Sequence, residues 1–294
     1  MSSVMKTIVV ATDFSERSDR AIRRAKLLAR EFDAKVYLVH VVDNDQPQAI
    51  VQAERDASTE LLEELTHTLG ETDAVKCDFR VVLGNPFVGI TQAARDLGAD
   101  LIVIGSHRRR LLRDILVGTT AERTIRVADR PVLMANGVPT GSYRRAIAAS
   151  DLSASSEATI RTAKSLGLFD RLKLSLLHVF SAPGIALMNR ASLSDDEKQS
   201  YIAGERKRAS EEVTSFMDRI KVDGMSTILK LANASIAETI CATASELSAG
   251  LIVIGTCGRS VIGRALMGSV TESVLRNSDR DVLAIPPRQD GTGS

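Results

Sequence analysis

The 294-residue chain contains two copies of one sequence pattern. The segment IVVATDFSERSDRAIRRAKLL, which starts at Ile8, recurs as AIAASDLSASSEATIRTAKSL from Ala146, and DLGADLIVIGS from Asp96 returns as ELSAGLIVIGT from Glu246. The offset grows from 138 to 150 residues between the two pairs, so the second copy carries about twelve additional residues, most simply within residues 181–200. A period this long indicates duplication of a whole domain rather than a solenoid.

The duplication predicts two domains, at residues 1–138 and 143–288. The chain has roughly twice the commonest domain length, which suits two complete hydrophobic cores. The segment NGVPTGS, residues 136–142, is rich in turn-forming residues and is the expected linker. Residues 289–294 are polar with nothing to bury, and we expect them to be a disordered tail.

Short apolar runs alternate with longer segments of helical periodicity within each copy. In the first copy the runs are TIVVAT, KVYLVHVV, CDFRVVLG, DLIVIGS and RPVLMA. Their continuous apolarity suits strands that are covered on both faces, as in a parallel sheet. Each copy is therefore predicted to be an α/β domain, a doubly wound parallel sheet of five strands in the order 3-2-1-4-5. Ligands of such sheets bind at the carboxyl ends of the strands where the order reverses, here between strands 1 and 4.

The composition narrows the classes of partner. The 38 Lys and Arg residues balance 37 Asp and Glu residues, so no overall field attracts nucleic acid or an anionic membrane. No apolar stretch reaches the roughly 20 residues of a membrane helix. The three cysteines lack the spacing of metal ligands, and the apolar run at the N-terminus is too short for a signal peptide. Both observations favour a cytoplasmic location. The basic run HRRRLLR, residues 107–113, lacks interleaved aromatic residues and is expected to be a solvated loop.

The second copy carries a glycine pattern at its predicted switch point. Asp151 follows strand 1, Gly255 ends strand 4, and Gly258, Gly268 and Ser269 come next. Glycines allow the backbone to approach a ligand closely. A helix that opens at Ser269 offers free N–H groups and a favourable dipole to a phosphate. The pattern therefore predicts a phosphate cradle.

A second interpretation explains part of this pattern without a ligand. Ser269 with Glu272, like Thr119 with Glu122, fits the S/T-x-x-E capping box, which by itself only starts a helix. The capping box does not account for the paired glycines at the end of strand 4. The whole constellation favours a nucleotide or phosphate site.

The spacing G-x2-G-x9-G-[S/T] after an apolar fourth strand, with an Asp after strand 1 and an LVHVV-like second strand, resembles the universal stress protein family. The resemblance covers both copies and nearly the whole chain, so the chain is similar to a tandem member. It implies a Rossmann-like fold of the adenine nucleotide alpha hydrolase type, often binding ATP, with association through the last strand and no single shared reaction. The last strands, RPVLMA and RDVLAIPP, are therefore expected to pair within the chain as a pseudo-dimer, and a further homodimer stays open.

The resemblance also implies the residues that surround a nucleotide. In the second copy these are Asp151, Val179, Gly255, Gly258, Arg259, Gly268, Ser269 and Val270. The matching residues of the first copy are Asp13, Val41, Gly105, Arg108, Arg109, Gly118, Thr119 and Thr120.

The first copy departs from the family pattern at Arg108, which stands where the second copy has Gly258. If this position needs a positive φ or a bare backbone, an arginine strains the turn or fills the phosphate pocket. A guanidinium can also bind phosphate. We expect ATP, with or without magnesium, to bind mainly in the second copy, and the first site to be impaired or altered.

Other polar residues have two interpretations each. Asp13 and Asp151 either position a metal on the nucleotide or cap the turn through the serine two residues on. His40 and His178, at equivalent places in strand 2, are expected to be structural histidines. No metal site and no catalytic residue are predicted.

The sequence leaves three functions open. The leading one is a nucleotide-responsive stress protein that acts on an unnamed regulatory partner. The second is a slow ATPase or nucleotidyl-transfer enzyme, but no Walker lysine loop follows a strand and no base stands beside a nucleophile. The third is a protein-interaction scaffold with vestigial nucleotide sites.

Overall fold

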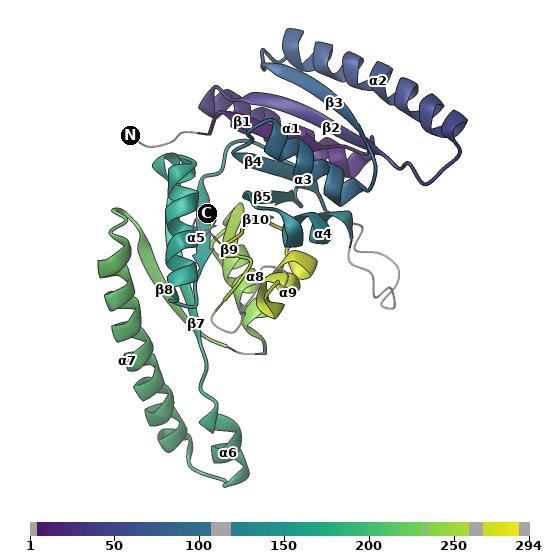
Figure 1. Cartoon of the computed structure of the whole chain (residues 1–294). Helices are drawn as coiled ribbons and strands as arrows, with labels where there is room; N and C mark the ends of the chain where they lie inside the picture. The colour runs from purple at the N-terminus through teal and green to yellow at the C-terminus, as the bar shows by residue number, and fades with distance from the viewer. Residues whose placement is uncertain (1–4, 107–118, 233, 259–266, 288–294) are drawn as a thin grey trace, which may run out of the picture.

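The computed structural model describes residues 5–106, 119–232, 234–258 and 267–287, and it places both halves on one ten-stranded sheet (Figure 1). The first half contains β1 (Thr7–Ala11), α1 (Glu16–Phe32), β2 (Lys35–Val42), α2 (Gln48–Glu71), β3 (Cys77–Leu83), α3 (Pro86–Asp96), β4 (Leu101–Gly105), α4 (Thr120–Val127) and β5 (Val132–Ala135). The second half contains β6 (Arg145–Ala149), α5 (Ala154–Ser165), the 3₁₀ helix η1 (Leu168–Arg171), β7 (Lys173–Phe180), α6 (Gly184–Arg190), α7 (Asp195–Ile220), β8 (Ser226–Leu231), α8 (Ile236–Glu246), β9 (Leu251–Gly255), α9 (Ser269–Asn277) and β10 (Asp281–Ile285).

The strand order across the sheet is β3-β2-β1-β4-β5-β10-β9-β6-β7-β8. Each half therefore has the predicted order 3-2-1-4-5, with parallel neighbours inside the half. The two last strands, β5 and β10, pair antiparallel, with Leu133 opposite Leu283 and Met134 opposite Val282. The expected pairing of the last strands is thus present within the chain and joins the halves into one sheet.

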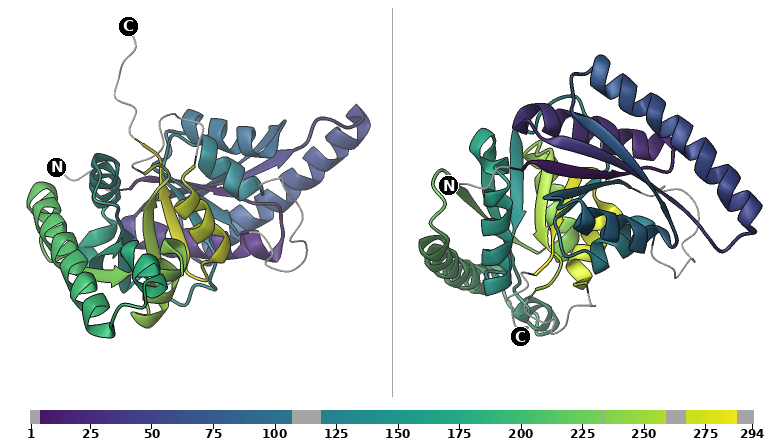
Figure 2. Two further views of the ribbon diagram at one scale, coloured as in Figure 1. Left: turned by 90° about the horizontal axis from the view of Figure 1, so that it is seen from below. Right: turned by 45° about the horizontal axis from the view of Figure 1, so that its top comes forward.

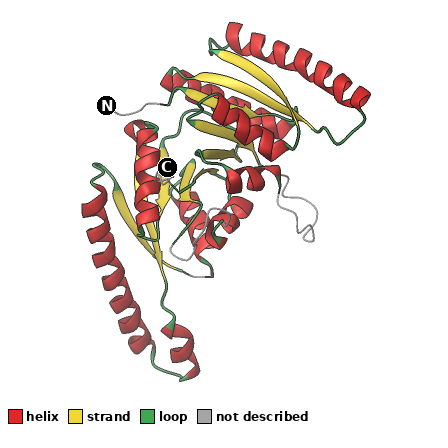
Figure 3. Cartoon of the chain, in the orientation of Figure 1, coloured by secondary structure: helices red, strands yellow, loops and turns green. Residues whose placement is uncertain are grey.

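Helices cover both faces of the sheet (Figures 2 and 3). Ile8 and Val10 of β1 belong to the core under α1, α2, α5 and α7, while Val9 and Ala11 belong to the core under α3, α4, α8 and α9. Successive side chains of a strand point to opposite faces, so a strand that is buried on both faces must be apolar throughout. This is the physical reason for the continuous apolar runs.

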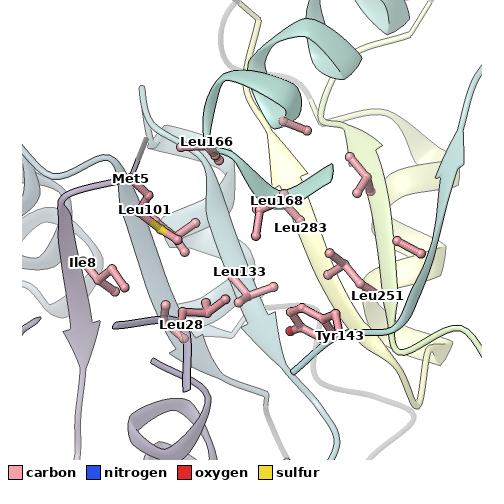
Figure 4. Packing of buried hydrophobic residues seen from close by; sticks show 14 of the residues in the cluster. Met5, Ile8, Leu28, Leu101, Leu133, Tyr143, Leu166, Leu168, Leu251 and Leu283 are labelled. Atoms are coloured by element: carbon pink, nitrogen blue, oxygen red, sulfur yellow. The ribbon is translucent and has the colours of Figure 1, made fainter. Parts of the chain in front are cut away.

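The core on the first of these faces continues across the junction of the halves. Leu28 of α1, Leu133 of β5, Leu168 of η1 and Leu283 of β10 belong to one buried cluster, seen from close by in Figure 4. Each of these side chains is at most 5% exposed. Burial of a leucine contributes roughly 1.5–3 kcal/mol, so this shared core is a substantial part of the attachment between the halves.

The additional residues of the second half form α6 and the first turn of α7. These elements project away from the sheet in Figure 1, and α6 buries none of its residues. Ser194 is the N-cap of α7 and forms a reciprocal capping box with Glu197.

A buried polar cluster ties the linker to both halves, and we call Arg24, Tyr143 and Asp281 the Asp281 cluster. The Asp281 carboxylate accepts hydrogen bonds from Arg24 Nε (2.8 Å), Tyr143 Oη (2.6 Å) and the backbone N–H groups of Asn136 (2.9 Å) and Gly137 (3.1 Å). The Arg24 guanidinium lies 4.0 Å from the centroid of the Tyr143 ring. Burial, followed by the neighbouring carboxylate of Asp281, raises the pKa of Tyr143 well above its ordinary 10.0.

The Asp281 cluster breaks the symmetry of the duplication. In the other half the equivalent positions hold Thr162, Met5 and Pro131. None of these side chains can form an ion pair, so the Asp281 cluster has no counterpart at the equivalent place.

Candidate functional site

The switch point of the first half opens into a cavity of about 570 Å³. Its lining includes the predicted residues Asp13, Val41, Gly105, Thr119 and Thr120. They come from the end of β1, from β2, from the end of β4 and from the start of α4. The structure thus brings these five residues together where a doubly wound sheet binds its ligand. Arg108, Arg109 and Gly118 lie outside the described residues.

Glycine is required at the end of β4 because α1 passes close by. A Cβ at Gly105 would overlap the backbone carbonyl of Arg17, and a backbone atom cannot move aside as a flexible side chain can. At the equivalent Gly255 a Cβ would stand 2.7 Å from Thr159 Oγ1. Gly105 is therefore needed for the packing of α1 against β4, whether or not a ligand binds, whereas at Gly255 the Thr159 side chain would have to move.

Asp13 is held by the turn that follows β1. Ser15 donates to Asp13 Oδ1 through its backbone N–H at 3.1 Å and through its hydroxyl, and Arg17 Nη2 lies 3.4 Å from Oδ2. Burial raises the pKa of Asp13, but the hydrogen bonds from Ser15 outweigh it, so the net pKa lies below the ordinary value. The carboxylate is thus ionised at neutral pH, as either of its two interpretations requires.

The second half brings Asp151 next to the middle glycine of its motif. Asp151 Oδ1 accepts hydrogen bonds from the hydroxyls of Ser153 and Ser156, each at 2.6 Å. A Cβ at Gly258 would stand 3.1 Å from Asp151 Oδ2, and a Cβ at Gly268 would stand 4.0 Å from Gly258 N. Asp151, Gly258 and Gly268 therefore converge on one small region.

The structure contradicts one of the two explanations for the middle glycine, Gly258, namely that its backbone has a positive φ. The motif glycines at positions 105, 255, 258 and 268 are not among the residues with positive φ. The constraint at Gly258 is the limited space beside Asp151, because a contact of 3.1 Å is tighter than a Cβ normally tolerates. The bare-backbone interpretation agrees with the structure, and the strain interpretation does not.

The capping-box interpretation is also wrong for the second half. Ser269 is the first helical residue of α9, the N-cap is Gly268, and no described side chain caps this helix. In α4 the N-cap is Thr119, and its hydroxyl accepts a hydrogen bond from the N–H of Glu122 at 3.2 Å. The first N–H groups of α9 therefore remain without a side-chain cap, whereas the start of α4 is partly satisfied by its own threonine.

The structure places two of the three remaining predicted residues of the second half. Val179 is in β7 and is 9% exposed, Val270 lies in the first turn of α9, and Arg259 lies outside the described residues. Among the residues that the structure describes, no three His, Cys, Asp or Glu side chains are grouped as metal ligands.

The two strand-2 histidines contact the backbone of strand 1. His40 Nδ1 lies 2.9 Å from the carbonyl of Thr12, and His178 Nδ1 lies 2.9 Å from the carbonyl of Ser150. A carbonyl can only accept, so each Nδ1 donates. Both histidines hold strands 1 and 2 together at their carboxyl ends, as expected of structural residues.

The sequence analysis missed two arginines that line the first-half cavity. Arg17 comes from α1 and Arg123 from α4. The equivalent positions of the second half hold Ser155 and Ser273. A position-by-position comparison of the two copies would have shown this difference, but only the fold shows that both positions face one cavity.

The fold defines a tandem, doubly wound α/β protein, and the first half has a cavity at its switch point. The model of the universal stress protein family matches residues 5–136 and 142–286, so the chain belongs to the universal stress protein family.

The relatives clarify how the chain is built. Universal stress protein MJ0531 of Methanocaldococcus jannaschii is 36% identical over 143 residues, which are 45% of this chain and 82% of that protein. The solved universal stress protein of Archaeoglobus fulgidus covers 97% of this chain and 97% of its own, with a TM-score of 0.72 at 18% identity, and shares the fold. A universal stress protein solved in complex with cAMP is 24% identical over 45% of this chain and 97% of its own, with a TM-score of 0.38. Some relatives thus correspond to one half, and others to the whole tandem chain.

None of the helices formed by the described residues combines the length and the apolarity that crossing a membrane requires.

Proposed function

We propose that this protein binds an adenine nucleotide, ATP in the first place, mainly in its second half, and that it acts as a nucleotide-responsive regulator in a stress response. The observation that carries the proposal is the uncapped start of α9 beside Gly258 and Asp151. Free helix N–H groups and a bare backbone segment are the groups that bind phosphate in α/β proteins.

The contrast between the halves supports the second half as the main site. At the start of α4 a phosphate would compete with the Thr119 hydroxyl, which already accepts from Glu122. At the start of α9 no such competitor is present among the described side chains. In the first half Arg17 and Arg123 line the cavity, and guanidinium groups offer a different way to bind phosphate. The first site is therefore proposed to bind differently and more weakly.

The regulatory part of the proposal requires unequal binding to two states. A nucleotide shifts a conformational equilibrium only by the difference between its affinities for the two conformations. The residues that the family resemblance implies for the nucleotide include Gly258 and Gly268, which precede α9, so occupancy would act on the surface at the carboxyl end of β9. A partner that binds this surface would distinguish the nucleotide-bound protein from the free protein.

The test is isothermal titration with ATP, AMP and cAMP, on the wild-type chain and on Gly258→Arg. The arginine places a side chain 3.1 Å from Asp151 Oδ2 at its first atom and fills the space beside α9. We expect ATP binding to weaken at least about tenfold, the equivalent of 1.4 kcal/mol. Gly204→Arg is the matched control, because Gly204 is exposed on α7 and a Cβ there meets nothing within 4 Å.

The outcomes separate the parts of the proposal. Wild-type affinity in Gly258→Arg would place the main site elsewhere and contradict the assignment to the second half. Absence of any heat with the wild-type chain, and of nucleotide released from the purified protein on denaturation, would contradict nucleotide binding as a whole. Steady release of ADP at ordinary enzymatic rates would favour an ATPase over a regulator.

A further inference from the structure

A second cavity, of about 980 Å³, lies between the two halves and away from both switch points. It is bordered by the second part of α1, by linker residues 140–143, and by the segments that directly precede β6, β7, β9 and β10. The cavity therefore lies at the amino ends of the second half's strands, whereas the candidate nucleotide site of that half lies at the carboxyl ends. Of its 14 lining residues six are arginines and one, Glu31, is acidic.

Three of these arginines carry charges that no carboxylate neutralises. Within the described part of the chain, the side chains of Arg144 and Arg171 have neither a hydrogen bond nor an ion pair, and the Arg145 side chain donates only to the carbonyl of Leu247, at 3.0 Å. By contrast, Arg24 is neutralised by Asp281, and Arg280 Nε lies 3.5 Å from Asp279. The cavity thus concentrates positive charge in a chain whose overall charge is only +1.

The fold does not require these arginines. The duplication provides an internal comparison, because every lining residue has an equivalent in the other half. The equivalents of Arg30, Arg144, Arg145 and Arg171 are Leu168, Lys6, Thr7 and Asp33. Leu168 is a buried core residue in a half that folds in the same way. The equivalent of Arg24 is Thr162 and that of Arg280 is Arg130, so four of the six lining arginines have equivalents that are not basic, and most of the basic lining is specific to this cavity.

The chemistry of the lining selects the ligand class. Guanidinium groups bind phosphate oxygens through paired N–H donors, and several of them on different elements suit an anion with several phosphates. Tyr143 is the single aromatic residue among the described residues of the lining, it is 8% exposed, and Arg24 covers its ring. The described lining consequently has no free ring on which a base could stack.

We propose that this arginine-lined cavity binds a polyphosphate chain, recognised through its phosphates alone. The chain is either free inorganic polyphosphate or the polyphosphate tail of a nucleotide, since both present the same group to the arginines. A ligand held there contacts α1 of one half and the β6 and η1 segments of the other, so it bridges the halves. The inference is independent of the proposed nucleotide site.

The test is titration calorimetry with inorganic tripolyphosphate and, in a second arm, with ATP. Arg144→Ala/Arg171→Ala removes two exposed side chains that form no hydrogen bond within the described part of the chain, so the fold is expected to persist, with an unchanged circular dichroism melt. We expect tripolyphosphate binding to weaken at least about tenfold, because hydrogen bonds from charged donors are among the strong ones. Lys6→Ala/Arg208→Ala is the matched control, because it also removes two positive charges. Lys6 is the first-half equivalent of Arg144, and Arg208 is a 74% exposed arginine of α7.

Each result decides between stated alternatives. Weakening of tripolyphosphate binding in the arginine variant alone supports the proposal, and weakening confined to the ATP arm identifies the nucleotide tail as the source. The proposal is overturned if the arginine variant binds both tripolyphosphate and ATP as the wild-type chain does, or if the wild-type chain binds neither. It is also overturned if the control variant loses as much affinity as the arginine variant. Failure of the nucleotide site is seen separately, as wild-type ATP affinity in Gly258→Arg.

Discussion

Replacement of Asp281 by alanine tests whether the Asp281 cluster holds the two halves together. The Asp281 side chain is 2% exposed and accepts four hydrogen bonds, from Arg24, from Tyr143 and from two linker N–H groups. Without the Asp281 carboxylate, the Arg24 guanidinium, whose side chain is 8% exposed, is a buried charge with no ion-pair partner. The linker N–H groups of Asn136 and Gly137 also lose their hydrogen-bond acceptor. Such an uncompensated buried charge is strongly destabilising.

The size of the effect follows from two opposing contributions. Hydrogen bonds to a charged group contribute about 1.5–3 kcal/mol each, but removal of Asp281 also removes the cost of burying its own charge. Breaking a buried ion pair from one side costs about 3–5 kcal/mol, and this is the loss in unfolding free energy that we expect. Asp279→Ala is the matched control: its carboxylate is 57% exposed and lies 3.5 Å from Arg280, so its loss is expected to cost at most about 1 kcal/mol.

Urea unfolding, followed by circular dichroism, measures both variants against the wild-type chain. Adding Arg24→Ala to Asp281→Ala should cost less than the sum of the two single changes, because the second change removes the unpaired charge. A loss for Asp281→Ala no larger than that for Asp279→Ala would refute the reasoning. Strict additivity of the double variant would refute the coupling.

Two further predictions concern pH and helix capping. Because the pKa of Tyr143 is raised in the folded protein, its contribution to stability is complete below the ordinary tyrosine pKa of 10.0 and decreases as the pH rises from there toward the folded pKa. The urea midpoint of the wild-type chain should therefore fall more steeply above pH 10.0 than that of Tyr143→Phe, and equal slopes would contradict the assignment. Thr119→Ala should lower the unfolding free energy by about 1 kcal/mol through loss of the α4 cap, whereas Ser269→Ala, at a position that caps nothing, should change it by less than about 0.5 kcal/mol. A larger loss for Ser269→Ala than for Thr119→Ala would show that the helix starts are assigned wrongly.

The sequence predicted the strand order and the pairing of the halves because these depend on patterns repeated along the chain. Runs such as TIVVA in β1 are apolar because both faces of the sheet are covered, and the duplication shows where the pattern restarts. The helix start expected at Ser269 is confirmed, whereas the capping-box alternative, in which Ser269 is the N-cap, is wrong because the N-cap is Gly268. The S/T-x-x-E pattern is compatible with both helix starts, and only the backbone conformation distinguishes them.

The parts that the sequence did not reveal depend on residues far apart in the chain. Asp281 is 257 residues from Arg24 and 138 from Tyr143, and no spacing rule joins them. The Arg144 and Arg171 side chains likewise share a cavity only because β6 and η1 lie next to α1. The sequence left two explanations open for Gly258, a positive φ and a bare backbone, because the atom that limits its side chain belongs to Asp151, at the end of another strand.

The antiparallel pairing of β5 with β10 determines which switch-point site a docking partner can contact. Inside each half the strands run parallel, so the carboxyl ends of the first half point one way along the sheet and those of the second half point the other way. The two switch-point sites therefore open toward opposite sides of the molecule. A partner that docks on one side would contact one of these sites only. If both sites bind nucleotide, two different partners would each respond to the occupancy of a different site.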